Sequence, residues 1–289
     1  SEPGPAPEPA LRLHPRAVKT VLRRARLVDP FFVGKYSYSP YHACAHGCRY
    51  CDGRAERYWV EGEFDRDIVV RTNAVELLRA ELGKARERGI VFIGSGVSDA
   101  YQPPEEEARL MRRSAQALVE RGFPATLLTK SSLVRRDLDV WAELNGKAGF
   151  LLMMSLVTLD DGLRQVFEPG ASPIEERLAT LAAFRQRGVA VGVAAMPLLP
   201  FLSDGAAETA RLFRRLSEIG VDFVLPGGLT LRPGRQKEAF LATLRTARPD
   251  LVPRYAELYA ENRPSGAPLA AYARDAHSRA LAACAEADL

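Results

Sequence analysis

Three cysteines stand close together in the first part of the chain, at Cys44, Cys48 and Cys51. Their C-x3-C-x2-C spacing places three thiols on one short loop. Thiolates are the usual protein ligands of iron–sulfur clusters. Three of them can hold three irons of a four-iron cluster and leave the fourth iron open to a reacting molecule, whereas a structural metal site is closed. The spacing therefore predicts a [4Fe–4S] cluster that takes part in chemistry.

A structural zinc site is the main alternative for this loop. It requires a fourth ligand, which His42 or His46 could supply in a crowded arrangement. A disulfide framework fits poorly, because such frameworks spread their cysteines through short secreted chains. The fourth cysteine of the chain, Cys284, lies far away on an expected C-terminal helix. We expect Cys284 to be a small buried apolar residue, and His46 to pack within the loop.

The composition suits a globular protein, since 47% of the 289 residues are hydrophobic and 26% are charged. A net charge of +4 permits an anionic partner such as a nucleic acid but does not require one. No apolar run approaches the roughly 20 residues of a membrane-spanning helix, so we expect no membrane partner and a cytoplasmic location. Residues 1–16 start rich in proline and glutamate, and we expect a disordered leader there.

Strands and helices alternate along the part of the chain that must position the cysteine loop. Short apolar runs predict strands at 35–39, 90–94, 125–129, 149–155, 189–196 and 222–225. Helical periodicity predicts helices at 105–120, 135–144, 173–187 and 206–219. Repeated strand–helix units imply a parallel sheet with helices outside it. We therefore expect an α/β fold, an incomplete barrel over residues 17–230, with a helical extension over 231–289 packed on it.

A set of short motifs surrounds the cysteine loop and follows it along the chain. In order they are Ser39-Pro40-Tyr41, Cys44-Ala45-His46-Gly47-Cys48-Arg49-Tyr50-Cys51, Ser98-Asp99-Ala100-Tyr101-Gln102-Pro103, Leu128-Thr129-Lys130-Ser131, Ser155-Leu156-Val157-Thr158-Leu159-Asp160, Glu168-Pro169 and Met196-Pro197-Leu198-Leu199-Pro200. Together they resemble the radical S-adenosylmethionine (SAM) superfamily, and within it the spore photoproduct lyase-like branch. The resemblance runs from about residue 35 to about residue 260 and does not identify a substrate.

The resemblance implies a partial TIM-like (β/α)6 barrel with the cluster loop after its first strand. It also implies an enzyme in which SAM binds the open iron and is cleaved reductively to methionine and a 5′-deoxyadenosyl radical. That radical would abstract a substrate hydrogen in a lyase- or oxidoreductase-type reaction, with an electron donor such as flavodoxin or ferredoxin. The protein would contribute positioning and the exclusion of water.

By the same resemblance, residues at the strand ends contact SAM. Ser98 and Asp99 follow the second strand, on the face where barrel sites lie, and the alternative is that they cap the next turn. Lys130, after the third strand, could pair with the SAM carboxylate, with an exposed lysine as the alternative. Ser155, at the end of the fourth strand, could contact the ribose or the carboxylate.

Two further residues complete the expected cofactor site. The segment Ala194–Met196 at the end of the fifth strand, with Ala195 in its middle, could pack against the adenine ring through backbone and side chains. Tyr50, inside the cysteine loop, could lie behind the adenine or the cluster, and core packing is its alternative role. No residue beyond the cluster and SAM contacts is assigned a catalytic role.

The sequence departs from the branch at two positions. In the spore-photoproduct repair enzyme, a cysteine two residues before the Ser-Asp pair returns a hydrogen atom to the product radical, and here that position is Gly96. Thymine spore-photoproduct repair by that route is therefore doubtful. After the cluster loop the branch often has Tyr-Ala-Arg, whereas this chain has Asp52-Gly53-Arg54.

Three kinds of substrate or role remain open. The branch and the basic charge favour a nucleic acid or nucleotide. The aromatic residues that flank the loop among arginines could stack bases or simply pack, and they are Tyr36, Tyr38, Tyr58 and Trp59. The missing donor cysteine leaves a small metabolite or peptide substrate as the alternative. A non-enzymatic metal- or DNA-binding protein is the third hypothesis.

Overall fold

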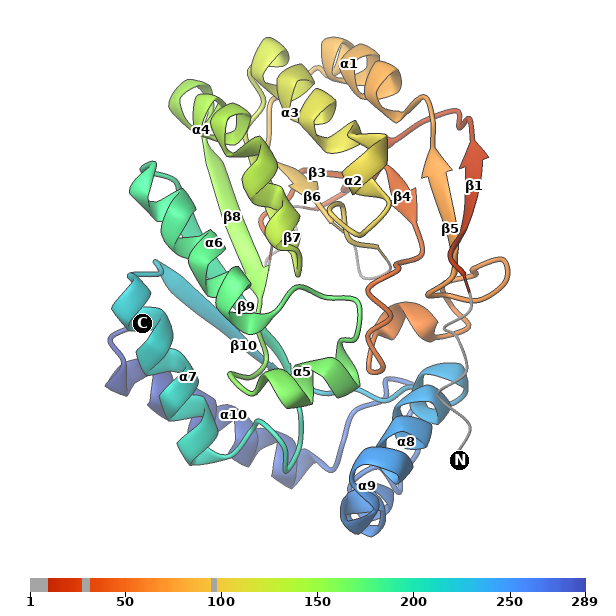
Figure 1. The fold of residues 1–289 in the computed structure, drawn as a ribbon, viewed down its shortest axis with the longest axis vertical. Helices are drawn as coiled ribbons and strands as arrows, with labels where there is room; N and C mark the ends of the chain where they lie inside the picture. The colour runs from red at the N-terminus through yellow and green to blue at the C-terminus, as the bar shows by residue number, and fades with distance from the viewer. Residues whose placement is uncertain (1–9, 28–31, 95–97) are drawn as a thin grey trace, which may run out of the picture.

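The computed structural model describes residues 10–27, 32–94 and 98–289. Its main sheet has seven strands in the order β10-β9-β8-β7-β6-β3-β2, and all neighbours are parallel except β2, which pairs antiparallel with β3 (Figure 1). The strands of this sheet are β2 (Leu22–Arg24), β3 (Tyr36–Tyr38), β6 (Val91–Ile93), β7 (Ala125–Thr129), β8 (Phe150–Ser155), β9 (Ala190–Leu198) and β10 (Phe223–Gly228). The expected α/β fold with six parallel strands is therefore confirmed.

Helices follow the strands and cover the outer face of the sheet (Figure 1). The helices before the last parallel strand are α1 (Ala74–Lys84), α2 (Glu105–Ala108), α3 (Leu110–Arg121), α4 (Leu138–Lys147), α5 (Asp161–Phe167), α6 (Ile174–Gln186) and α7 (Ala206–Ile219). The helix expected at 105–120 is divided at Arg109, whose φ of 48° is left-handed. The buried carboxylate of Glu105 accepts bonds from the backbone N–H groups of Leu110 and Met111, so it caps the second of the two helices.

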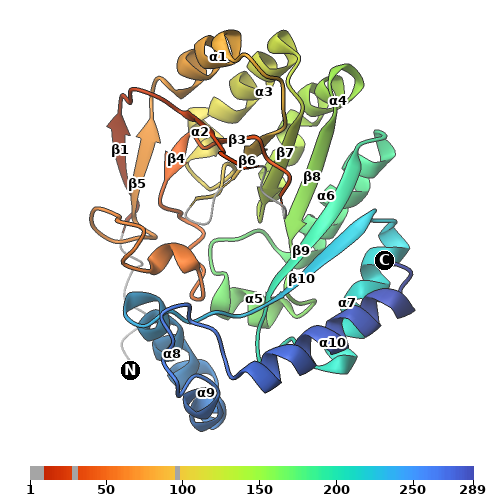
Figure 2. The same ribbon diagram turned by 180° about the vertical axis from the view of Figure 1, so that it is seen from behind.

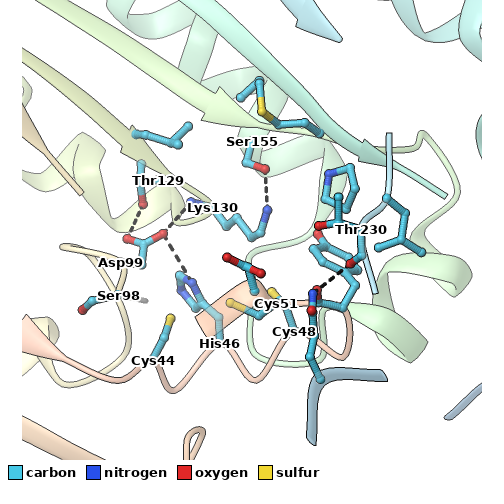
Figure 3. Close-up of a pocket in the computed structure, with 18 of the residues that line it drawn as sticks. Cys44, His46, Cys48, Cys51, Ser98, Asp99, Thr129, Lys130, Ser155 and Thr230 are labelled. Carbon is cyan, nitrogen blue, oxygen red and sulfur yellow. Dashed lines mark hydrogen bonds and ion pairs between the residues drawn. The ribbon is translucent and has the colours of Figure 1, made fainter. Parts of the chain in front are cut away.

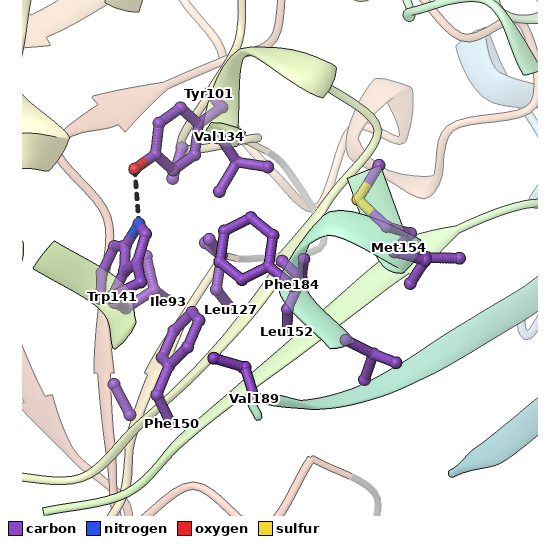
Figure 4. Close-up of a cluster of buried hydrophobic side chains, with 14 of the residues drawn as sticks. Ile93, Tyr101, Leu127, Val134, Trp141, Phe150, Leu152, Met154, Phe184 and Val189 are labelled. Atoms are coloured by element: carbon purple, nitrogen blue, oxygen red, sulfur yellow. Dashed lines mark hydrogen bonds between the residues drawn. The ribbon is translucent and has the colours of Figure 1, made fainter. Parts of the chain in front are cut away.

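The core between the helices and the outer face of the sheet is apolar and aromatic (Figure 4). Trp141 of α4 stacks on Phe150 of β8 with ring centroids 4.4 Å apart, and Phe184 of α6 packs beside Phe150. The indole N–H of Trp141 donates to the hydroxyl of Tyr101 at 2.8 Å, which in turn donates to Asp137 at 3.0 Å. The polar atoms of this layer are thus satisfied without water.

A second, smaller sheet contains β1 (Arg12–Arg16), β5 (Asp67–Arg71) and β4 (Tyr41–His42), in the order β1-β5-β4. Residues 1–9 lie outside the described part of the chain, but the expectation of a disordered leader through residue 16 is wrong for β1. Arg12 and His14 both contact the carboxylate of Asp67, at 2.7 and 2.9 Å. These contacts, together with the strand pairing, order a segment that has no buried side chain of its own.

The C-terminal part of the chain is helical and packs against two different parts of the fold (Figure 2). Its helices are α8 (Arg235–Ala247), α9 (Val252–Leu258) and α10 (Ala270–Glu286). Helix α10 packs on α7 and β10, where Cys284 is buried in the main core. Helix α8 instead contacts the short 3-10 turn η1 (Asp52–Arg54) that follows the cysteine loop. No helix among the described residues has the length and apolar character that crossing a membrane requires.

Candidate active site

A cavity of about 330 Å³ lies at the carboxyl end of the parallel strands (Figure 3). Residues on or just after β6 to β10 form one side of it, and the cysteine loop forms another. This end of a parallel sheet is where α/β folds bind ligands. The residues that line it are Cys44, His46, Cys48, Tyr50, Cys51, Asp52, Ser98, Asp99, Leu128, Thr129, Lys130, Ser155, Ala194, Met196, Pro197, Gly228, Leu229, Thr230 and Gln236.

All three predicted cluster cysteines contribute to this cavity. Cys44 and Cys48 are buried, whereas Cys51 is partly exposed. Burial raises the pKa of all three thiols, that of Cys48 to about 12. Such thiols keep their protons until a metal centre displaces them, because metal ligation requires the thiolate. The donor set therefore fits a metal cofactor bound from one side of the cavity.

The arrangement of these donors distinguishes between two kinds of metal site. Within residues 10–27, 32–94 and 98–289, no three histidine, cysteine, aspartate or glutamate side chains converge closely enough to hold a single metal ion. A four-iron cluster binds each thiolate to a different iron, so its ligands are spread around it. Neither candidate fourth ligand for zinc joins the thiols: His46 Nδ1 lies 3.4 Å from Asp99, and His42 Nε2 lies 3.1 Å from the carbonyl of Trp59.

The buried amide of Gln102 ties the cysteine loop to the segment after β6. Its Oε1 accepts from the backbone N–H of Ala45 at 2.8 Å, and its Nε2 donates to the carbonyl of Ala43 at 3.1 Å. The same Nε2 lies 3.2 Å from the hydroxyl of Ser98. Gln102 is fully buried, so these bonds are not shared with water. Sequence reasoning placed Gln102 in a motif but did not assign it this positioning role.

Two other supports hold the loop. Arg54 donates from Nε to the carbonyl of Cys48 at 2.9 Å and from Nη2 to the carbonyl of Gly47 at 3.0 Å. On another side, the N–H of Gly170 donates to the carbonyl of His46 at 2.9 Å. A Cβ at Gly170 would lie 2.6 Å from a carbonyl oxygen of the loop, so only glycine allows this approach. The loop is therefore fixed before any cofactor binds.

Lys130 brings a positive charge into the cavity. Its ammonium donates to the hydroxyl of Ser155 and lies 3.4 Å from Glu168 Oε1 (Figure 3). The other carboxylate oxygen of Glu168 lies 2.7 Å from the buried guanidinium of Arg177, and Tyr50 donates its hydroxyl to Oε1. Burial opposes the charge of Glu168, but Arg177 and Lys130 prevail and lower its pKa to about 2. Two cations share one carboxylate, so this group carries one surplus positive charge.

Asp99 lines the cavity, and its carboxylate also has the turn-capping role that was the alternative to a SAM contact. Its carboxylate accepts from the hydroxyl of Thr129 at 2.7 Å and from the backbone N–H groups of Lys130 and Tyr101, both at 2.8 Å. Burial works against its ionised form, yet His46 and these donors keep its pKa below the ordinary value. Asp99 thus joins the ends of β6 and β7 and positions Lys130, while neighbouring Ser98 lines the cavity with its hydroxyl bonded to Gln102.

The expected contact at Ala195 falls on the wrong face of its strand. Ala195 is fully buried in the main apolar core and is absent from the cavity lining. Its neighbours Ala194 and Met196 line the cavity instead, because successive side chains of a strand point to opposite faces. Gly96, where the repair enzyme has its donor cysteine, lies outside the described residues.

Helix α8 and the segment after β10 form the rim. Gln236 Nε2 donates to the carbonyls of Tyr50 and Thr230, both at 2.9 Å, so it joins the cysteine loop to the end of β10. Arg232 Nε donates to Asp52 Oδ1 at 2.5 Å beside it. The departure from the branch pattern at Asp52 therefore creates an ion pair across the rim, which the sequence alone did not indicate.

Comparison with known proteins agrees with this geometry. The family model described as the radical SAM superfamily matches residues 38–213. An uncharacterized protein of Mycobacterium tuberculosis is 34% identical over 230 residues, which are 78% of this chain and 67% of the relative. The radical SAM Nalpha-GlyT isomerase of Pseudomonas phage M6 is 24% identical over 204 residues, 70% of this chain and 41% of the phage protein.

Among solved structures, a spore photoproduct lyase mutant with bound AdoMet and dinucleoside spore photoproduct has a similar fold. The TM-score is 0.66 at 17% identity, and the match covers 91% of this chain and 78% of that one. At this identity the likeness concerns the fold alone. The family match covers more than half of the chain, including the cysteine loop and the strands β6, β7, β8 and β9. The chain belongs to the radical SAM superfamily, with a fold like that of spore photoproduct lyase.

Proposed function

We propose that this protein is an enzyme that holds a [4Fe–4S] cluster through Cys44, Cys48 and Cys51 and binds SAM beside it in the 330 Å³ cavity. The observation that carries the proposal is the meeting of three thiols with the ammonium of Lys130 in one cavity. When bound together, a reduced cluster and SAM supply a 5′-deoxyadenosyl radical that abstracts a substrate hydrogen. Flavodoxin or ferredoxin would be the class of electron donor.

The residues of the chain bind and orient SAM in this proposal. Lys130 pairs with the SAM carboxylate, which supplies the negative charge that the group with Glu168 and Arg177 lacks. Ser98 and Ser155 offer hydroxyls from two other strand ends. Because Lys130 and Ser155 are held by neighbours before the ligand arrives, little ordering is required on binding.

The apolar part of the cavity suits the rest of SAM. Ala194 and Met196 line it opposite the loop, and they could pack against the adenine ring. Tyr50, whose hydroxyl is bonded to Glu168, forms part of the wall between the loop and Lys130. These side chains exclude water from the place where a radical would form, which prevents side reactions.

For the substrate we propose a nucleic acid or nucleotide. One comparison supports this class, because the similar fold was solved with a dinucleoside spore photoproduct bound. The type of reaction, lyase or oxidoreductase, depends on the substrate. Thymine spore-photoproduct repair is not proposed, since Gly96 stands where the repair enzyme has its donor cysteine.

The decisive test is SAM cleavage. The protein would be purified without oxygen, loaded with iron and sulfide, reduced with dithionite and given SAM, and 5′-deoxyadenosine would be measured by mass spectrometry. We expect product from the wild type and none from Cys48→Ala, which lacks one cluster ligand. The Cys284→Ala variant is the matched control and should keep the product, because Cys284 lies in the distant core. Purified protein that carries zinc, takes up no iron and forms no product would overturn the proposal.

A further inference from the structure

A second and larger cavity lies beside the active site. It has a volume of about 710 Å³ and shares no lining residue with the first cavity. It is bounded by β2, β3 and β4 and by the end of β5, where the main sheet faces the small sheet. The residues that line it are Thr20, Val21, Leu22, Arg23, Ser37, Tyr38, Ser39, Tyr41, His42, Tyr58, Arg71 and Gly94.

The charged side chains that line this cavity are positive. Arg23 and Arg71 line it together with His42, and no aspartate or glutamate is among the described residues of its lining. Arg71 is half-buried and donates from Nη1 to the carbonyl of Ser39 at 2.6 Å. Burial lowers the pKa of Arg71, and the nearby charge of Arg23 acts in the same direction. The two guanidinium groups therefore repel each other across a space that an anion could fill.

Other half-buried or buried arginines of the chain are neutralised. Arg54 pairs with Asp65, Arg136 with Glu105, and Arg177 with Glu168, all at 2.6 to 2.7 Å. By contrast, within the described residues neither Arg23 nor Arg71 has a carboxylate within 4.0 Å. Arg23 is exposed, whereas Arg71 is partly buried. A partly buried cation without a counter-charge is costly, so an anionic ligand beside Arg71 would stabilise it. Phosphate matches the guanidinium fork through paired hydrogen bonds.

An exposed aromatic ring stands beside this cavity. Trp59 is 74% exposed, although it directly follows the cavity residue Tyr58. The carbonyl of Trp59 contacts His42, which also lines the cavity, so the two are held together. Tyr36 and Tyr38, which were also candidates for base stacking, are buried in the core. An indole that stays in water next to a phosphate-binding surface is suited to stack on a nucleobase.

The second cavity is continuous along the chain with the active site. His42 precedes Cys44 by two residues, and Gly94 precedes Ser98 by four. Cys44 and Ser98 both line the first cavity, whereas His42 and Gly94 line the second. The loop residues 42–44 therefore connect the two cavities, and a polymer held in the second cavity would extend along this loop to reach the first.

We propose that the second cavity binds a backbone phosphate of a polynucleotide substrate, with Arg23 and Arg71 as its ligands and Trp59 as the stacking surface for an adjacent base. This inference rests on the proposed function and narrows its substrate from any nucleotide to a nucleic-acid strand. A free mononucleotide would not need a phosphate site separate from the catalytic cavity.

The test is the binding of a fluorescein-labelled single-stranded DNA oligonucleotide, followed by polarisation over a range of salt concentrations. We expect Arg23→Ala and Arg71→Met each to weaken binding on the order of tenfold at low salt, because each removes a charge-assisted contact. Each should also reduce the slope of log K against log salt, and the double variant should reduce it by about 0.7, because the two arginines share one phosphate contact on a single strand. Trp59→Ala should weaken binding and leave that slope unchanged.

Three controls keep the outcomes distinct. Arg214→Ala removes an exposed arginine of α7, far from the cavity, and should bind as the wild type does. Arg71→Lys retains the charge and should recover most of the salt slope, which separates a phosphate contact from a folding defect. The inference would be overturned if Arg23→Ala and Arg71→Met bound the oligonucleotide as tightly as Arg214→Ala does. It would also be overturned if the wild type did not bind the oligonucleotide, or if an equimolar mononucleotide displaced it.

Failure of the inference and failure of the proposed function would look different. A wild type that makes 5′-deoxyadenosine but binds DNA without the two arginines would contradict the inference alone. A wild type that binds DNA through the two arginines but never cleaves SAM would contradict the proposed function and leave the phosphate site in place.

Discussion

The outer face of the main sheet and the carboxyl ends of its strands both bury side chains, but of opposite kinds. On the outer face, Trp141, Phe150 and Phe184 fill the space under the helices, and each polar atom has a partner within the layer. At the carboxyl ends of the strands, Glu168 and Arg177 are as deeply buried, yet they are charged. Removing apolar surface from water stabilises the fold, whereas burying ions costs free energy that their mutual attraction only partly recovers. The outer layer therefore stabilises the fold, whereas the charged groups at the strand ends serve ligand binding.

The largest expected effect tests the outer layer. Phe184→Ala removes a fully buried ring and should lower the free energy of unfolding by about 3–5 kcal/mol, because the cavity it leaves cannot collapse completely. Urea denaturation followed by circular dichroism would measure this loss. The affinity of the folded fraction for SAM should stay as in the wild type. A change in SAM affinity alongside the stability loss would show that the outer apolar layer and the ligand-binding end of the sheet are not independent.

Lys130→Met tests the charged region at the carboxyl ends of the strands. It should raise the Kd for SAM on the order of tenfold to a hundredfold, since a charge-assisted contact is lost. The free energy of unfolding should change by less than about 1 kcal/mol, because Glu168 keeps its pairing with Arg177. Calorimetric titration of the cluster-loaded protein measures the first quantity. Lys84→Met, at the exposed end of α1, is the matched control, and equal Kd values for the two variants would refute the role of Lys130.

The smallest effect is expected at the rim. Arg232→Ala breaks the ion pair with Asp52 between two partly exposed side chains, and such pairs contribute about 0–1 kcal/mol. Thermal unfolding at low and high salt would measure this difference, which should vanish as salt screens the pair. A loss of unfolding free energy well above 1 kcal/mol that persists at high salt would contradict this. It would mean that the ion pair at the rim is shielded from solvent, like the buried pair of Glu168 and Arg177.

Strands β6 to β10 of the main sheet could be predicted because each contains a short apolar run, and β3 because aromatic and polar residues alternate in it. Strand β2 could not be predicted, because two of its three residues are exposed arginines. Strand β1 could not, since all of its side chains are exposed and its order depends on Asp67, more than fifty residues away. The cysteines, Lys130 and Ser155 could be placed because they stand at or near strand ends. Gln102 was harder to assign, because its partners are backbone groups of a distant loop and leave no mark in the sequence.

One signal for the buried ion pair was present in the sequence. On helix α6, the core residues Ile174, Leu178 and Leu181 share an apolar stripe, and Arg177 lies on the same stripe at helical spacing. A charge on the buried face of a helix requires a counter-charge inside the fold. Glu168 meets that requirement, but the sequence does not reveal which of the 36 acidic residues would do so.

The surplus charge at Lys130 has a consequence for how the protein persists in a cell. An anion that binds there binds the folded chain and not the unfolded one, so its concentration enters the folding equilibrium. At a hundred times its dissociation constant, such a ligand adds about 2.7 kcal/mol to the free energy of unfolding. The folded fraction of the protein, and with it the lifetime of the protein, would then depend on the concentration of this ligand. A shortage of the ligand would lower the amount of folded protein.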